Sequence, residues 1–264
     1  MSKEKQVNSE YISNPFVLAY RASQKLFNTN RGWAIFLIVT GIFSTLSQGN
    51  DLSGRQLTQS ASTSTPPVSI ELVVFVASFV ALFVIVVFVL SIYLSGILSY
   101  VTLQSEKGKK VGVREAMDAT SKRFWRLCGS LALALVKILG WSLLFIIPGI
   151  IAALRYSLLS YVIMDEPAER RVKESHERIK TLTKGRLLEV FGMVFTSIVP
   201  FVGALFNTAG NAALYRQLQI STDKNIEKPK IHWLNYFLLL ILLLITIVAG
   251  VVVANNVIFG NYDL

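Results

Sequence analysis

The sequence predicts an all-α fold, a polytopic bundle of transmembrane helices. The chain of 264 residues is 53% hydrophobic and only 16% charged, whereas ordinary soluble domains are about one quarter charged. Two long runs, residues 72–105 and 234–261, contain no charged side chain. Uncharged apolar runs above about 18 residues are candidate membrane-spanning helices. We therefore expect a membrane protein rather than a soluble domain with a large core.

The basic residues follow the pattern of loops in a multi-pass protein. The net charge is +10, and most Lys and Arg residues fall in four segments, at 1–32, 104–128, 165–187 and 220–231. A nucleic-acid-binding protein would instead gather them in one patch on a soluble fold. Alternation with apolar spans is what the positive-inside rule predicts for cytoplasmic loops. We expect a multi-pass protein of the cell membrane with a cytoplasmic N-terminus, and no nucleic-acid partner.

We expect residues 1–32 to form a cytoplasmic tail that contains an interfacial helix. Asn14 followed by Pro15 is typical of a helix start. Apolar side chains between Phe16 and Phe27 fall on one face of the helix that follows. Such a helix lies along the inner membrane surface before the chain enters lipid.

Residues 33–264 are predicted to form a single transmembrane domain. Its first span, 33–47, is short, and residues 48–69, rich in Ser and Thr, are predicted to form an external loop. A helix over 72–105 would measure about 50 Å, which exceeds a bilayer core of roughly 30 Å. Its more polar second half should therefore tilt strongly or project into the cytoplasm.

Three later segments are predicted to be cytoplasmic, 104–127, 165–186 and 220–232, and the first two carry amphipathic helices. The first contains a helix over 111–127, which we expect to lie at the interface before a separate span begins at Cys128. The second is predicted to begin at Asp165 and Glu166, because acids before a proline favour a helix start. On that helix His176 is expected to be solvated.

Pro148 and Pro200 each predict a broken hairpin. In the first, 128–147 enters the membrane and 150–164 returns; in the second, 187–199 enters and 201–218 returns. The return over 150–164 measures only about 22 Å, so a short, buried or re-entrant helix is one alternative. Because each hairpin follows a basic amphipathic helix, they form a weak internal repeat. With a last span over 234–254, the count is about six or seven.

Several motifs carry a family resemblance. They are IPGI at 147–150, RYSL at 155–158, ESHERIKTLTKG at 174–185 and ALYRQL at 213–218. Together they resemble bacterial integral membrane proteins of unknown function that are related to the membrane domain of glycerophosphoryl diester phosphodiesterase. The matching positions include Ser175, Lys184 and Gly185, and the resemblance covers roughly residues 85–220. It implies a helical membrane fold without an assigned activity, since no stretch alternates strands and helices as a phosphodiesterase barrel would.

Lys137 and Arg155 are the charged residues most expected within helices at lipid depth. A charge in that position is costly and by default indicates function, such as binding an anionic substrate or lipid headgroup. The alternative is that each side chain extends to the interface or pairs with an acid such as Glu189. Arg155 is the stronger candidate because it follows the first helix break.

Asn207 and Asn211 complete the candidate binding residues. They lie one helical turn apart and would line a polar cavity, or else bond neighbouring helices. The sequence predicts no catalytic site, no cofactor and no metal site. Its single cysteine and two histidines supply too few ligands for a metal cluster, and no phosphate-binding loop is present.

Two function classes follow from these features. The first is a non-enzymatic membrane component that organises lipids, in particular anionic ones, or partner proteins at the cytoplasmic leaflet. A membrane protein or a second copy of the chain would then be its protein partner. The alternative is a transporter or permease whose site lies between the two Pro-broken hairpins. A cavity lined by Arg155, Asn207 and Asn211 would favour transport, and mutual bonds among them the first class.

Overall fold

The computed structural model describes residues 11–54, 70–224, 226 and 229–259, and these residues are helical with no strand. One 3-10 turn, η2 (Thr196–Ile198), accompanies the α-helices. The helices are α2 (Pro15–Thr29), α3 (Arg31–Gly54), α4 (Ile70–Glu106), α5 (Val113–Leu144), α6 (Ile146–Tyr156), α7 (Leu159–Asp165), α8 (Val172–Thr183), α9 (Leu187–Phe195), α10 (Gly203–Asp223) and α11 (Trp233–Phe259).

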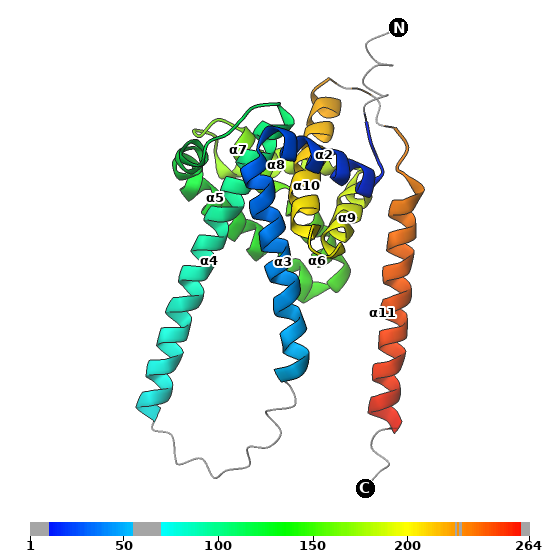
Figure 1. Cartoon of the computed structure of the whole chain (residues 1–264). Coiled ribbons are helices and arrows are strands. Elements are labelled where there is room, and N and C mark those ends of the chain that lie inside the picture. Colours follow the sequence, from blue (N-terminus) through cyan, green and yellow to red (C-terminus); the bar gives the residue numbers. More distant parts are fainter. Residues whose placement is uncertain (1–10, 55–69, 225, 227–228, 260–264) are drawn as a thin grey trace.

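Three long helices, α3, α4 and α11, extend in one direction from a compact group of helices (Figure 1). We call this group the headpiece: α2, the Ile92–Glu106 part of α4, and α5 to α10. Its core is built from buried apolar side chains of all these elements, among them Leu26, Leu103, Leu127, Ile163 and Leu214. The buried core therefore sits at one end of the molecule. The parts of the long helices that extend beyond the headpiece are largely exposed.

Four helical segments are long and apolar enough to cross a membrane. They are Ile70–Glu106, Val113–Leu144, Ile146–Asp165 and Trp233–Asn255; two further apolar helices, Arg31–Leu46 and Leu187–Ile198, are shorter. The all-α fold with membrane-capable helices is thus confirmed. The predicted count of six or seven spans is not confirmed, since four segments of the described chain meet the length of a span.

The outer part of α4 shows why lipid is needed. Its most apolar stretch is entirely exposed, as is nearly all of that in α11; Phe75, for example, is 70% exposed. Apolar surface on this scale is stable only when a membrane or partner covers it. From Ile92 onward α4 is buried in the headpiece, where Ser99 Oγ lies 3.0 Å from Ser160 Oγ. This burial explains the polar second half of the run.

The predicted interfacial helix over 111–127 and the span after it form one continuous helix, α5. The expected boundary at Cys128 is therefore wrong. Leu127, Ser130 and Ala134 are all buried, and their spacing continues a single helical face past that boundary. No proline falls within the helix to end it.

The first hairpin turns at Phe145 rather than at Pro148. Phe145 has extended backbone between α5 and α6, and Pro148 lies in the first turn of α6, where proline needs no donor partner. Gly149 permits the close return, because a Cβ there would lie 2.1 Å from Ser142 Oγ of α5.

The second reversal lies between η2 and α10, where Pro200 stands in the turn. Phe201 has a φ of 65°, a left-handed conformation that is uncommon for a residue with a side chain. Gly203 approaches Ser197 so closely that a Cβ would meet its carbonyl oxygen at 2.1 Å. The external loop predicted over 48–69 is shorter at its start, because residues 48–54 continue α3. Residues 55–69 lie outside the described residues.

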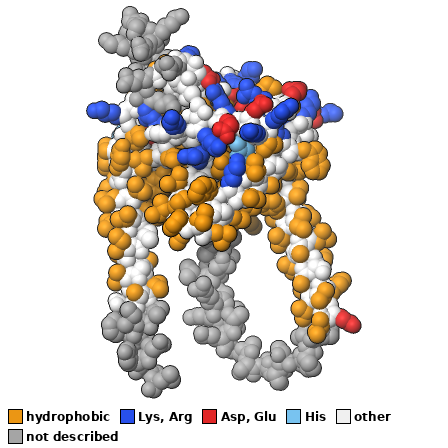
Figure 2. All heavy atoms as spheres, turned by 180° about the vertical axis from the view of Figure 1, so that it is seen from behind, with side chains coloured by type: hydrophobic (Ala, Val, Ile, Leu, Met, Phe, Trp, Pro, Cys, Tyr) orange, Lys and Arg blue, Asp and Glu red, His pale blue; other side chains and the backbone are white. Residues whose placement is uncertain are grey.

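The three predicted cytoplasmic segments meet at one end of the headpiece. Ion pairs link them to each other and to α2: Lys25 with Glu106 at 3.2 Å, Lys107 with Asp165 at 2.7 Å, and Arg178 with Asp223. Charged side chains gather at this end, above a broad apolar surface (Figure 2). These segments therefore lie on a common side of any membrane that the apolar surface enters.

Candidate lipid-headgroup site

Lys137 lies where α5, α6 and α8 meet. Its Nζ is 3.2 Å from Nδ1 of His176 on α8 and 5.6 Å from the centre of the Tyr156 ring on α6. The Tyr156 and His176 rings are 5.0 Å apart. No ion pair joins Lys137 to an acid within the described chain. The ammonium is thus held by an imidazole nitrogen and an aromatic face rather than by a carboxylate.

His176 is buried, so the expectation of a solvated residue is wrong. It is 1% exposed, and its Nε2 lies 3.1 Å from the carbonyl oxygen of Ser130. Because Lys137 can only donate, Nδ1 accepts and Nε2 donates its proton to that carbonyl. Burial, and then the charge of Lys137, lower the pKa of His176 below its ordinary value. The ring is therefore held in its neutral form.

The reason for this error is the width of the buried face of α8. The helix packs against α5, α6, α7 and α10, so its buried arc is wider than a single stripe. The buried residues are Ser175, His176, Ile179, Leu182 and Thr183. The i, i+3 and i+7 spacing of His176, Ile179 and Thr183 places His176 on this wider face.

Arg155 is a half-buried cation without a partner in the described chain. It lies in the last turn of α6. Its Nε is buried and unbonded, and no hydrogen bond or ion pair links the guanidinium to another described residue. Glu189, the acid considered as its partner, pairs instead with Arg186 at 2.9 Å. A buried donor without an acceptor is costly, so the Arg155 guanidinium has unmet hydrogen-bonding capacity within the described chain.

Asn207 and Asn211 satisfy each other. Asn211 Nδ2 donates to Asn207 Oδ1 at 2.6 Å along α10, and both side chains are half-buried. Among the described residues no hydrogen bond connects them to Lys137 or Arg155. The structure thus places the two cations on the neighbouring helices α5 and α6, with the asparagines as a separate bonded pair.

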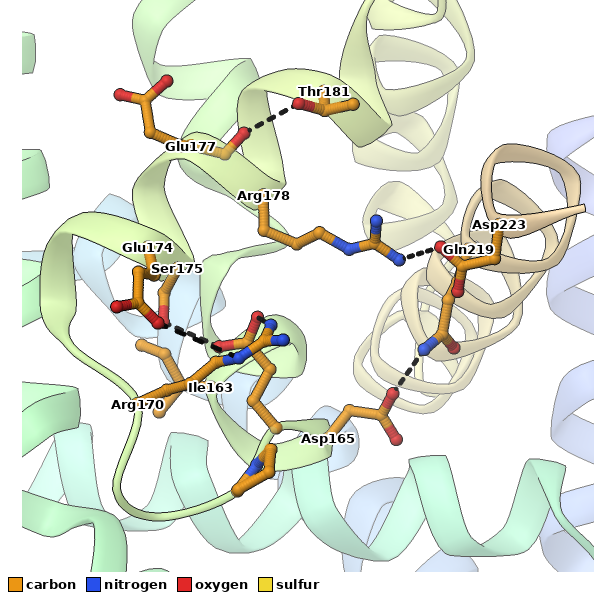
Figure 3. Close-up of polar contacts among 12 residues, drawn as sticks. Ile163, Asp165, Arg170, Glu174, Ser175, Glu177, Arg178, Thr181, Gln219 and Asp223 are labelled. Atoms are coloured by element: carbon orange, nitrogen blue, oxygen red, sulfur yellow. Dashed lines mark hydrogen bonds and ion pairs between the residues drawn. The ribbon is translucent and has the colours of Figure 1, made fainter. Parts of the chain in front are cut away.

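Asp165 and Glu166 do not start a helix as predicted, since α8 begins at Val172. Asp165 ends α7 and accepts a hydrogen bond from Gln219 of α10 at 2.8 Å (Figure 3). It accepts a second from Tyr215, also on α10, at 3.0 Å. Glu166 accepts from Ser175 at 2.8 Å and from Arg170 at 2.8 Å. These carboxylates therefore tie α7 to α8 and α10.

Arg126 holds the same turn from the opposite side. It is 8% exposed, and it donates to the carbonyl oxygens of Ile163, Pro167 and Arg170. The sequence alone did not predict this role. A single basic residue carries no signal in the sequence that distinguishes a carbonyl clamp from a solvated charge.

The described residues contain no group of three or more His, Cys, Asp or Glu side chains placed to hold a metal ion. Cys128 is a half-buried free thiol. Lys137 and Arg155 are the basic side chains of the candidate site.

Comparisons with protein-family models, curated proteins and solved structures found no match to this chain. The resemblance to the membrane domain related to glycerophosphoryl diester phosphodiesterase stays a prediction. The functional argument therefore rests on the geometry of the site.

Proposed function

We propose that this chain is a non-catalytic, multi-pass protein of the cell membrane that binds anionic lipid headgroups at the cytoplasmic leaflet. The observation that carries this proposal is the position of Arg155. Ile147, Ile150 and Ile151 of α6 are 71%, 49% and 40% exposed, and Arg155 follows about 6 Å further along the helix. A cation one turn above lipid-facing isoleucines stands at the depth of headgroup phosphates.

The proposed topology places the N-terminus and the charged end of the headpiece in the cytoplasm. In it, α3, α4 and α11 cross the membrane, and the α5–α6 and α9–α10 hairpins enter from the cytoplasmic side, which gives about six or seven membrane segments. The gathering of basic residues at one end supports this orientation. In a Cys128→Ser background, Glu71→Cys should react with an impermeant maleimide on intact cells, and Lys173→Cys only after permeabilisation. The reverse pattern would overturn the orientation.

The alternative is transport through a site between the two hairpins. It requires polar side chains that face a shared cavity. The bond between Asn207 and Asn211 favours the first class, because a mutually satisfied pair has less need of a solute. Headgroup binding with organisation of lipids or a partner protein is therefore the function that we propose.

The test compares Arg155→Ala with Arg171→Ala, a change at an exposed basic residue outside the site. Full-length protein is titrated in detergent with short-chain phosphatidylserine, and phosphatidylcholine serves as the neutral control. Arg155→Ala should weaken phosphatidylserine binding about fivefold or more, since one well-placed basic residue contributes about 1 kcal/mol. Arg171→Ala should change it less than about twofold. Unchanged binding by a well-folded Arg155→Ala protein would show that the site is wrongly assigned.

A further inference from the structure

A second basic site lies between α2 and α10 at the charged end of the headpiece. A cavity of about 420 Å³ opens there, which is within the size range of small-ligand sites. Its apolar lining includes Leu18, Ala22, Ala213 and Ile220. Its basic lining consists of Arg21, Lys25, Arg216 and Lys224. The cavity therefore combines an apolar wall with a cluster of cations.

The crossing of α2 and α10 explains why a cavity forms here. At Gly210 the helices approach so closely that a Cβ would lie 3.1 Å from the Cβ of Ala19. Apart from Leu18, the lining residues of α2 follow Ala19 and those of α10 follow Gly210 in the chain. Arg21 and Lys25 are four residues apart on α2, and Arg216 and Ile220 are four residues apart on α10. Each helix therefore presents one continuous face to the cavity.

The charge of the cavity is poorly balanced by the protein. Glu106 is the carboxylate among the described lining residues, and Lys25 donates to it at 3.2 Å. Arg216 donates to the neutral amide oxygen of Gln219 at 3.0 Å. The side chains of Arg21 and Lys224 make no hydrogen bond or ion pair with a described residue. Four cations that share a hollow with one described carboxylate repel one another, and an anion between them relieves that repulsion.

We propose that this cavity binds a phosphate monoester with a short apolar portion. Two arginines favour phosphate, because the guanidinium donates two parallel hydrogen bonds to its oxygens. The excess of positive charge suits a dianion better than a single carboxylate. The apolar wall formed by Leu18, Ala213 and Ile220 accepts the rest of the ligand. Phosphate of this kind is carried both by soluble metabolites and by the lipid phosphatidic acid.

The test titrates full-length protein in detergent at about 150 mM salt with two probes, inorganic phosphate and dioctanoyl phosphatidic acid. The cavity variant Arg21→Glu/Lys224→Glu is compared with Arg171→Glu/Lys184→Glu, which makes the same change in net charge at exposed residues outside the cavity. We expect the cavity variant to bind at least about tenfold more weakly, and the matched variant to stay within about twofold. Arg155→Ala should leave the binding of inorganic phosphate unchanged, which separates the cavity from the headgroup site.

Each result of this titration either supports or overturns the phosphate site. Binding of both probes, lost in the cavity variant alone, supports a phosphate site of either source. Binding of phosphatidic acid alone identifies the lipid as the source, and binding of phosphate alone identifies a soluble ligand. Equal losses in the two double variants, or no binding of either probe to the parent protein, overturn the proposal. Should the charge reversals unfold the protein, Arg21→Gln/Lys224→Gln applies the same criterion with a smaller perturbation.

Discussion

The buried ion pair between Arg186 and Glu189 offers a sharp test of how the headpiece is held together. Their side chains are 10% and 2% exposed and 2.9 Å apart. Tyr11 donates its hydroxyl to Glu189 at 2.5 Å, and Arg186 lies over the Tyr11 ring at 5.6 Å. Burial and the charge of Glu189 raise the pKa of Tyr11, so its hydroxyl stays a donor. We predict that Glu189→Gln destabilises this cluster strongly.

The magnitude follows from the charge that remains. Glu189→Gln leaves the Arg186 guanidinium buried without an opposite charge. Removing one partner of a buried pair costs about 3–5 kcal/mol. Glutamine keeps an acceptor and the Tyr11 ring still faces the cation, which together recover about 1 kcal/mol. We therefore expect a loss of about 2–4 kcal/mol, or about 5–10 °C in Tm for a chain of this length.

Thermal unfolding of the purified protein in detergent, followed by the loss of the monodisperse peak in size-exclusion chromatography, measures this shift. The double variant Arg186→Met/Glu189→Leu is the control, because an apolar pair of similar volume avoids the uncompensated charge. It should recover at least half of the lost Tm. A Glu189→Gln protein within about 1 °C of the parent, or a double variant less stable than Glu189→Gln, would refute the reasoning.

Two further predictions concern stability. Because the pKa of His176 is lowered by burial and by Lys137, the unfolded chain binds a proton more readily than the folded one. The free energy of unfolding should then keep its full value above the ordinary histidine pKa of about 6.5 and fall as the pH drops below that value. His176→Gln should flatten this part of a Tm-against-pH curve, and an unaltered curve would contradict the assignment. Gly192→Ala should lower Tm by several degrees, because its Cβ would lie 1.9 Å from Oδ1 of Asn235 on α11. Gly112→Ala, which has open space, is the control; an equal effect of both changes would show that this contact is unimportant.

The presence of helices that could cross a membrane was predictable, because it depends only on the amino-acid composition of short stretches of the chain. The exposed outer parts of α4 and α11 are the two runs without charge in the sequence. The start of α2 was also predictable, since Asn14 Oδ1 accepts from the backbone amides of Phe16 and Val17. Such caps involve residues next to one another in the chain.

Element boundaries were less predictable where packing overrides a local signal. Pro148 reads as a break, yet it lies inside the first turn of α6 because proline is tolerated there. Asp165 and Glu166 read as a helix start, yet their oxygens accept bonds from α8 and α10. In both cases the residue type is consistent with two roles, and only the position of other helices selects one.

The candidate site shows the same division. Lys137 and Arg155 were chosen as candidates from the sequence because a charge within an apolar helix stands out in a local window. Their surroundings were not found, since His176 contacts Lys137 across 39 residues of sequence. Likewise, the cations of the α2–α10 cavity come from segments about 200 residues apart.

The sequence by itself determined that this protein is helical, that its apolar runs suit a membrane, and where its basic residues are concentrated. These properties add up residue by residue, so no knowledge of the partners is needed. Only the tertiary structure decided which charges are paired, which are left without an acid, and where a cavity opens. Those outcomes depend on helix crossings such as the one at Gly210, and a crossing is set by the shapes of two helices together.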